Sequence, residues 1–520
     1  MSQYVMKDLI CQNQLKKRFF ALIADEYTDI SNREQLSLCL RWVDDALVPH
    51  ETFLGFYEVP NIQSTTIVKA ILDVLVRLEI PLDNCRGQCY DGASNMMGKK
   101  SGVAQQIKDR QPKSVVTHCH AHSLSLGVKD VVKDVKILSD TMSTTKEIVT
   151  LVKYSPKRQN ILGNIRQNLR SEDDDDFSPG NVLKFCPTRW TVTAKCYKRI
   201  LDNYDALLQL WDTSLTSKLD SETRARIIGC QSQMMTFDFF FAVYLSQRIF
   251  AHTDNLAAAL QSRNLSAAGG KHLAELTIKT LQSIRNEESF DNCFSTAVLL
   301  AKKHDDISEP KLPRKRRVPT RFETGTADPT YHETPRDHYR QIYLQAVDHA
   351  IVSISDRFEQ PAFQILAELE NLLINSCNSK NIAKELEAIK EHYTDDIDYV
   401  SLEAQLATFA VMIKDVIKCF QDVVTQIKEL DDYVKPLIGE VIKVCSLILV
   451  NPATSASGER SFSTARRIKS YTRATMTQAR FNHLTFLNIH KDLMQKLNII
   501  PVANQFVALN SLRQQRFGRF

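Results

Sequence analysis

Continuous and alternating apolar runs dominate the first 60 residues and predict three strands. Residues 19–25 form an unbroken apolar run that ends on Asp25, as in a strand buried on both faces. Residues 36–42 alternate between apolar and polar side chains, and residues 52–59 form a third run after a short polar link. Links this short favour an antiparallel meander.

The spacing changes after the third run. Apolar residues between 67 and 78 recur as on one face of a helix, which Pro81 ends. Residues 85–91 then predict a fourth strand, residues 101–110 a second helix and residues 114–120 a fifth strand. Three strands, helix, strand, helix and strand is the order of a ribonuclease H-like sheet. Helical spacing prevails through most of the remaining chain.

Composition and charge narrow the class of protein only moderately. The 520 residues are 43% hydrophobic and 24% charged, which excludes collagen-like and wholly disordered chains. A net charge of +5 is too small to identify a nucleic-acid partner. No apolar run approaches the roughly 20 residues that span a bilayer, so we expect no membrane partner. The N-terminus lacks a signal-peptide pattern, and the 12 cysteines are expected to be free thiols.

Two aspartates stand where apolar strands give way to polar residues. Asp25 and Asp91 would converge if the first and fourth strands were neighbours, and carboxylate oxygens suit Mg²⁺. Two such ions would support phosphodiester transfer. Each aspartate can equally be an ordinary turn residue. Asp29 competes with Asp25 as the first ligand, but Asp25 directly follows the apolar run and is preferred.

Five motifs, in this order, resemble those of hAT (hobo/Ac/Tam3) transposases. They are ADEYTD (24–29), CYDGASNM (89–96), HCHAH (118–122), CPTRW (186–190) and NPATSASGERSFS (451–463). Within that superfamily the chain is similar to the domesticated branch that includes zinc finger MYM-type proteins and the 52 kDa repressor of the inhibitor of the protein kinase. The resemblance covers nearly the whole chain.

The resemblance implies a catalytic triad of Asp25, Asp91 and Glu459 that holds two Mg²⁺ ions. Glu459 follows Asp91 by 368 residues, a gap that a helical insertion explains. The small polar stretch before Glu459 independently predicts a helix start, where an acid also compensates the helix dipole. That dipole interpretation of Glu459 stays open.

The fold class expected is α/β plus α: a ribonuclease H-like mixed sheet core interrupted by a large all-helical insertion. The expected parts are a truncated N-terminal helix at 1–18, the first part of the core at 19–190, a helical insertion at 191–440 with a mobile basic loop near 308–336, the end of the core with the hAT C-terminal dimerisation region at 441–495, and a tail at 496–520.

Four further residues are expected to contact DNA. The resemblance implies a positioning role near DNA for Cys119 and His122; a zinc site there is not expected, because the other half of a four-ligand set is missing. Trp190 can stack on an extruded base while Arg189 holds a phosphate, or Trp190 can be a core anchor.

A proline-flanked basic cluster suits nuclear import or phosphate contact, or is a solvated loop. Its residues are Lys311, Arg314, Lys315, Arg316, Arg317 and Arg321. The expected location is the nucleus.

The apolar run at 441–450 must bury itself in the core or against a partner, and the resemblance implies a homodimer or higher oligomer through this region.

Two functions remain open at this stage. The first is a hAT-like DNA transposase with Mg²⁺-dependent cleavage and transfer of DNA strands. The second is a catalytically silent, dimerising nuclear DNA-binding or transcription-regulatory protein derived from a transposase. An ordinary ribonuclease H-like nuclease is disfavoured by the helical half of the chain.

Overall fold

The computed structural model describes residues 2–12, 15–169, 180–183, 192–262, 265–312, 332–359, 362–413, 416–518 and 520. The chain forms two compact units. The first comprises Met1–Ser123, Leu260–His272 and Glu359–Phe520, and the second comprises Leu124–Ala259 and Leu273–Phe358. The sequence places the start of the helical insertion at residue 191, whereas the second unit begins at Leu124.

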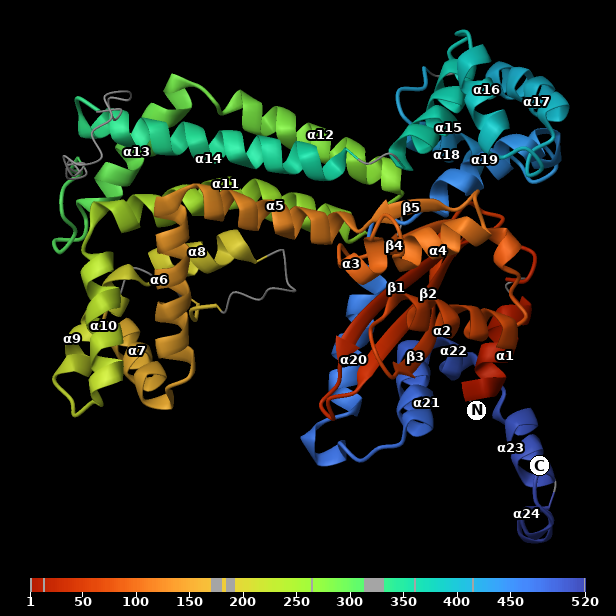
Figure 1. The fold of residues 1–520 in the computed structure, drawn as a ribbon, viewed down its shortest axis with the longest axis horizontal. Helices are drawn as coiled ribbons and strands as arrows, with labels where there is room; N and C mark the ends of the chain where they lie inside the picture. The colour runs from red at the N-terminus through yellow and green to blue at the C-terminus, as the bar shows by residue number, and fades with distance from the viewer. Residues whose placement is uncertain are drawn as a thin grey trace. The chain divides into compact units, whose positions relative to one another are not determined.

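A five-stranded mixed sheet organises the first unit (Figure 1). Its strands are β1 (Phe20–Thr28), β2 (Glu34–Val43), β3 (Pro49–Val59), β4 (Cys85–Tyr90) and β5 (Val115–His118), in the order β3-β2-β1-β4-β5. The three N-terminal strands are antiparallel, whereas β4 and β5 run parallel to β1. The predicted order of strands along the chain is therefore confirmed, and the first and fourth strands are neighbours, which is the condition for Asp25 and Asp91 to converge.

Helices bury both faces of this sheet. On one face Phe20, Leu22 and Ala24 of β1 join a cluster with apolar residues of the N-terminal helices. Those helices are α1 (Ser2–Gln12), α2 (Ser64–Arg77) and α4 (Val103–Arg110), with the short elements η1 (Leu82–Asn84) and α3 (Ser94–Met97) between them. On the other face Ala21 belongs to a second cluster formed with C-terminal helices.

The C-terminal part of the first unit is helical. It contains α15 (Ala362–Cys377), α16 (Ala383–His392), α17 (Tyr399–Met412), α18 (Phe420–Glu429), η3 (Lys435–Ile438), α19 (Gly439–Leu449), α20 (Ala456–Ile468), η4 (Tyr471–Arg473), α21 (Gln478–Ile489), α22 (Lys491–Lys496), α23 (Ile499–Ala508) and α24 (Ser511–Phe517). Of these, α20 packs against β1 and β2, and α21 packs against β3.

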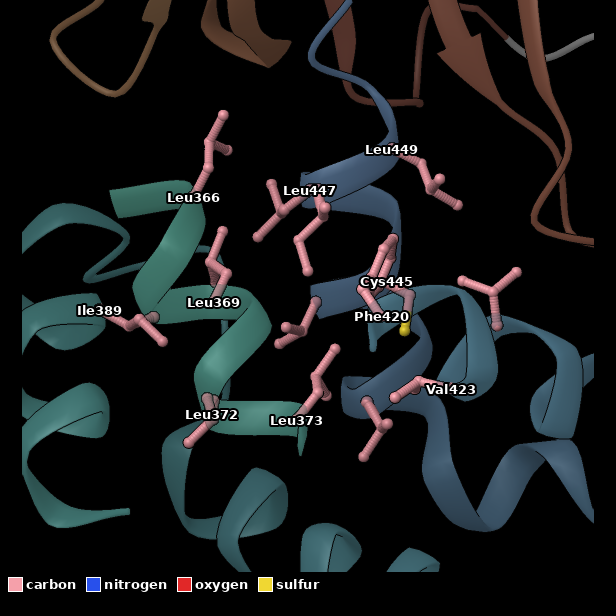
Figure 2. Close-up of a cluster of buried hydrophobic side chains, with 14 of the residues drawn as sticks. Leu366, Leu369, Leu372, Leu373, Ile389, Phe420, Val423, Cys445, Leu447 and Leu449 are labelled. Atoms are coloured by element: carbon pink, nitrogen blue, oxygen red, sulfur yellow. The ribbon is translucent and has the colours of Figure 1, made fainter. Parts of the chain in front are cut away.

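The apolar run at 441–450 is α19, and its side chains lie inside the chain's own core. Figure 2 shows Leu447 of α19 directed toward α15, with Cys445 of α19 and Leu369 and Leu373 of α15 in the same buried cluster. All four side chains are fully buried. Of the two fates expected for this run, burial within the same chain is the one observed.

The second unit is helical throughout its described residues. Its helices are α5 (His120–Asp134), α6 (Lys136–Lys153), α7 (Pro156–Asn168), α8 (Thr193–Leu201), α9 (Tyr204–Leu215), α10 (Ser221–Met234), α11 (Phe237–Leu260), α12 (Ala267–Ser283), α13 (Glu287–Ala301) and α14 (Pro335–Phe358), of which α5 and α12 have their first residues in the first unit. Among the residues that the structure places, no helix has the length and apolar character needed to cross a membrane.

Candidate active site

The pairing of β1 with β4 brings the two strand-end aspartates to one edge of the sheet. Ile23 pairs with Cys89 in parallel register. Asp25 and Asp91 each lie two residues further on, so the two-residue period of a strand directs both toward the same face. Both side chains are half-buried, and Asp91 accepts a hydrogen bond of 3.1 Å from the amide of Ala93.

Glu459 reaches this edge from α20, in whose first turn it lies, as the sequence predicts. The helix approaches β1 so closely that a Cβ at Gly458 would stand 3.0 Å from the Cβ of Asp25. One turn further along, the hydroxyl of Ser461 is 3.0 Å from that of Ser37 on β2. These contacts fix the helix against the two strands, and Glu459 is half-buried beside Asp25.

The three carboxylates affect one another electrostatically. Burial, followed by repulsion from Asp91, raises the pKa of Asp25 well above its usual range. Burial, together with repulsion from Cys119, Asp25 and Asp91, raises the pKa of Glu459 to about 9. Carboxylates held this close together are stabilised either when they take up protons or when they bind a cation.

The donor set suits a magnesium ion, since it consists of carboxylate oxygens with water access. Across the described ranges, however, no three His, Cys, Asp or Glu side chains are already gathered closely enough to hold a metal ion. A shared ion would therefore have to draw Asp25, Asp91 and Glu459 closer together. The mutual repulsion of the three acids is the feature that a cation would relieve.

Asp29, the competing candidate, is committed to a structural network. Its carboxylate forms a buried ion pair of 2.5 Å with Lys469, the residue that caps α20. It also accepts hydrogen bonds from the amides of Ser31 and Arg33 and from the side chain of Gln35. These contacts leave Asp25 as the better candidate ligand on β1.

Glu26 is a residue at this edge that the sequence analysis missed. The side chain of Asn95, from the CYDGASNM motif, donates to both carboxylate oxygens of Glu26 at 3.2 Å and to the carbonyl of Ile62 at 2.9 Å. Burial raises the pKa of Glu26 to about 7 despite the hydrogen bond from Asn95, and Asp91 adds to the rise. The position of both residues inside recognised motifs was the available signal.

The HCHAH motif is adjacent to the loop that carries Asp91. The amide of Cys119 donates to the carbonyl of Tyr90 at 2.8 Å, and a Cβ at Gly92 would come within 2.6 Å of the His118 ring and 3.4 Å of the His122 ring. Both predicted contact residues of this motif, Cys119 and His122, therefore adjoin the loop that carries Asp91.

Cys119 also ties this motif to the start of α20. The amide of Ser455 donates to its Sγ at 3.3 Å. Burial alone would raise the pKa of the Cys119 thiol, but hydrogen bonds from Cys89 and Ser455 outweigh it and lower that pKa to about 6. The segment that precedes Glu459 is thus anchored to the aspartate-bearing half of the site.

His120 has a structural environment. It is fully buried, its amide donates to the carbonyl of Ala453, and its Nε2 lies 3.0 Å from the carbonyl of Ala267. Burial lowers the pKa of His120 to about 4, so the ring is neutral at physiological pH. The first, second, third and fifth motifs therefore meet within the first unit.

Several predicted site residues lie outside the described part of the chain. They include the whole CPTRW motif with Arg189 and Trp190, and the basic residues Arg314, Lys315, Arg316, Arg317 and Arg321. Of the basic cluster, the structure describes Lys311, which is exposed.

Two family models match the chain. Residues 2–102 match "ZMYM1/FAM200, RNase-like domain", which includes β1 to β4 with Asp25 and Asp91. Residues 433–493 match "hAT family C-terminal dimerisation region", which includes α19 to α21 with Glu459. The predicted ribonuclease H-like α/β core with an added helical region is confirmed.

The chain is also similar over most of its length to curated proteins. It is 23% identical over 496 residues to the "52 kDa repressor of the inhibitor of the protein kinase" of Mus musculus, and 22% identical over 499 residues to the protein of that name of Homo sapiens. Each alignment covers 93% of this chain and 63% of the relative, so the chain spans somewhat less than two thirds of either relative's length. The chain is therefore similar to hAT-like, transposase-derived proteins in an N-terminal RNase-like region and a C-terminal dimerisation region.

Proposed function

We propose that this protein cleaves and transfers DNA strands in a metal-dependent reaction of the transposase type. The observation that carries the proposal is the convergence of Asp25, Asp91 and Glu459, from β1, the end of β4 and α20, at one edge of the sheet. Neighbouring carboxylates that repel one another destabilise the folded state. Their presence together therefore points to a function such as cation binding.

Asp25, Asp91 and Glu459 would hold the ions through their carboxylate oxygens. Bound magnesium supplies activation of a water or 3′-hydroxyl nucleophile and stabilisation of the leaving oxygen. In the metal-free protein Glu459 carries a proton at neutral pH, since its pKa is about 9, and it would release that proton as the cation binds. Asn95 holds Glu26 beside the same edge, where Glu26, with a pKa of about 7, can exchange a proton.

A nicking assay with Mg²⁺ or Mn²⁺ tests this function. Wild-type protein is expected to nick duplex DNA, and Asp91→Asn is expected to abolish nicking while the fold persists, because the neutral amide is a weaker cation ligand. Asp140→Asn is the matched control, since Asp140 is an exposed residue of α6. Equal nicking by wild type and Asp91→Asn would refute the proposal.

The second candidate is a regulator that retains the fold without cutting DNA. The name of the two relatives, which describes a repressor, favours it. Such a protein would bind DNA and form a homodimer or higher oligomer through residues 433–493, but would fail to nick DNA with either cation.

Either function would be exercised in the nucleus, and the basic cluster that includes Lys311 would serve as the import signal. Replacement of its basic residues by Ala should then leave the protein in the cytoplasm. The residues to replace are Lys311, Arg314, Lys315, Arg316 and Arg317.

A further inference from the structure

The segment that follows Glu459 contains no acidic residue until Asp492. Over the same stretch it carries seven basic residues: Arg460, Arg466, Arg467, Lys469, Arg473, Arg480 and Lys491. Two of them are paired within the fold, Lys469 with Asp29 and Arg460 with Glu51. We name Arg466, Arg467, Arg473 and Arg480 the arginine strip.

The inner side of this segment is firmly attached to the sheet. Phe462 packs on Tyr27 with ring centroids 4.7 Å apart, and Phe481 stacks on Phe56 at 5.4 Å. Gln478 exchanges hydrogen bonds with Gln35.

Two more hydrogen bonds pin the segment further along. The hydroxyl of Ser31 donates to the carbonyl of Ala474, and the side chain of Asn482 accepts from the amide of Phe56. In Figure 1, α20 and α21 accordingly lie beside the strands. The arginines therefore project from a backbone that is already ordered, which reduces the entropy lost when a ligand binds.

The arginine strip itself is exposed and lacks carboxylate partners. Each of its four side chains is exposed, and within the described residues none forms an ion pair. Several arginines of the second unit are paired instead: Arg285 pairs with Asp348, and Arg340 pairs with Glu287. Tyr471, at 87% exposure, lies between Arg467 and Arg473 in the chain.

The strip begins on the same side of α20 as the catalytic candidate. Glu459, Ser463 and Arg466 are spaced i, i+4 and i+7, which places them along one face of the helix. At a rise of about 1.5 Å per residue, Arg466 lies about 10 Å along the axis from Glu459. That distance corresponds to roughly three nucleotides of one strand of a duplex.

We infer that the arginine strip binds the phosphate backbone of duplex DNA and leads it to the carboxylate edge. Uncompensated arginines on an ordered scaffold are suited to phosphate oxygens, which they contact through two N–H groups at once. Within the dimerisation region at 433–493, a second copy of this chain fits the strip itself poorly, because a twofold interface centred on the strip would place like charges opposite one another. The inference rests on DNA as the partner in the proposed function.

The test measures binding of the full chain to a DNA duplex at several salt concentrations. The triple variant Arg466→Gln, Arg473→Gln, Arg480→Gln should bind unrelated duplex sequences about equally weakly. Its plot of log affinity against log salt should be shallower by about 2 to 3, because each lost phosphate contact removes about 0.9 from the slope. The Arg→Lys variant at the same three positions keeps the charge and should retain the wild-type slope.

The matched control changes the paired arginines Arg226, Arg285 and Arg340 to Gln, with the same loss of charge. This control should keep the wild-type slope. If its slope became as shallow as that of the strip variant, net charge alone would explain the effect and the inference would be overturned. An unchanged slope in the strip variant, binding of RNA duplex alone, or loss of the dimer as the cause of weaker binding would also overturn it. The salt dependence of binding is measured without a divalent cation and requires no nicking, so failure of the nicking assay and failure of this inference are distinguishable.

Discussion

The backbone of Gly458 lies against the side chain of Asp25, where a Cβ at position 458 would stand 3.0 Å from the Cβ of Asp25. Gly458→Ala should therefore push α20 away from β1, lower the free energy of unfolding by about 1–3 kcal/mol and slow nicking. Denaturant unfolding and the nicking assay measure the two effects. Gly163→Ala, inside α7 with no neighbouring atom within 4 Å, should instead be neutral or stabilising. If both variants behaved alike, the close approach of α20 to Asp25 would be irrelevant.

The ion pair between Lys469 and Asp29 should be costly to break from one side. Lys469→Met leaves Asp29 charged and buried, and should lower the free energy of unfolding by about 3–5 kcal/mol. Changing Asp29→Asn in addition should restore part of that loss, which denaturant unfolding of the single and double variants can show. Purely additive losses would contradict the coupling.

Asp29 should also make stability depend on acid pH. Burial alone would raise the pKa of Asp29, but hydrogen bonds from Lys469, Ser31 and Arg33 outweigh it and lower that pKa below its usual 3.8. The Asp29 carboxylate therefore adds to the free energy of unfolding above its usual pKa, and this stabilisation is lost as pH falls through the lower folded-state pKa. Unfolding curves below about pH 4 should show a smaller acid loss in the variant Asp29→Asn than in wild type.

The carboxylate edge should give the opposite pH dependence when no divalent cation is present. The pKa of Glu459 is raised from 4.5 to about 9, so the free energy of unfolding should fall as pH rises through that range. Glu459→Gln should flatten this fall. Addition of Mg²⁺ should raise the melting temperature of wild type at about pH 8 more than that of Glu459→Gln, and a chelator should reverse the gain. Equal increases in the melting temperature of wild type and Glu459→Gln would show that Glu459 does not bind the cation.

The packing of α19 predicts a loss of stability without a loss of oligomer. Leu447→Ala and Leu369→Ala each remove a fully buried side chain from the same cluster, and each should cost about 2–5 kcal/mol. Val411→Ala, at a side chain with 86% exposure, should be close to neutral. Sedimentation of the folded variants should show the wild-type oligomer, since this face is buried inside one chain.

The sheet could be predicted because its strands carry local signals. Alternation over residues 36–42 and the apolar run that ends on Asp25 specify strand type, and short links specify antiparallel neighbours. The position of α20 could not be obtained in this way. Its contacts with β1 and β2 depend on Gly458 and on pairs such as Ser37 and Ser461, which lie more than 400 residues apart in the chain. The place of Glu459 in the site was predicted from the motif resemblance, because hydrophobic periodicity carries no signal for this contact.

The choice between Asp25 and Asp29 shows the same limit. Both are aspartates near the end of one strand, and the sequence separates them only by the apolar run that Asp25 directly follows. The structure separates them through Lys469, whose charge reaches Asp29 from the far end of α20. The extent of the apolar cluster around α19 was equally inaccessible, because a helix with more than one apolar face is compatible with a core or with a partner.

The late position of α20 in the chain has a consequence for biosynthesis. Domains begin to fold from the N-terminal side as the ribosome delivers them. A nascent chain that has released β1 and β4 holds Asp25 and Asp91 but has not yet received Glu459, which is translated 368 codons after Asp91. The cleavage proposed for this protein would therefore be withheld during most of translation, and a product that stops before α20 would expose two acids with no third.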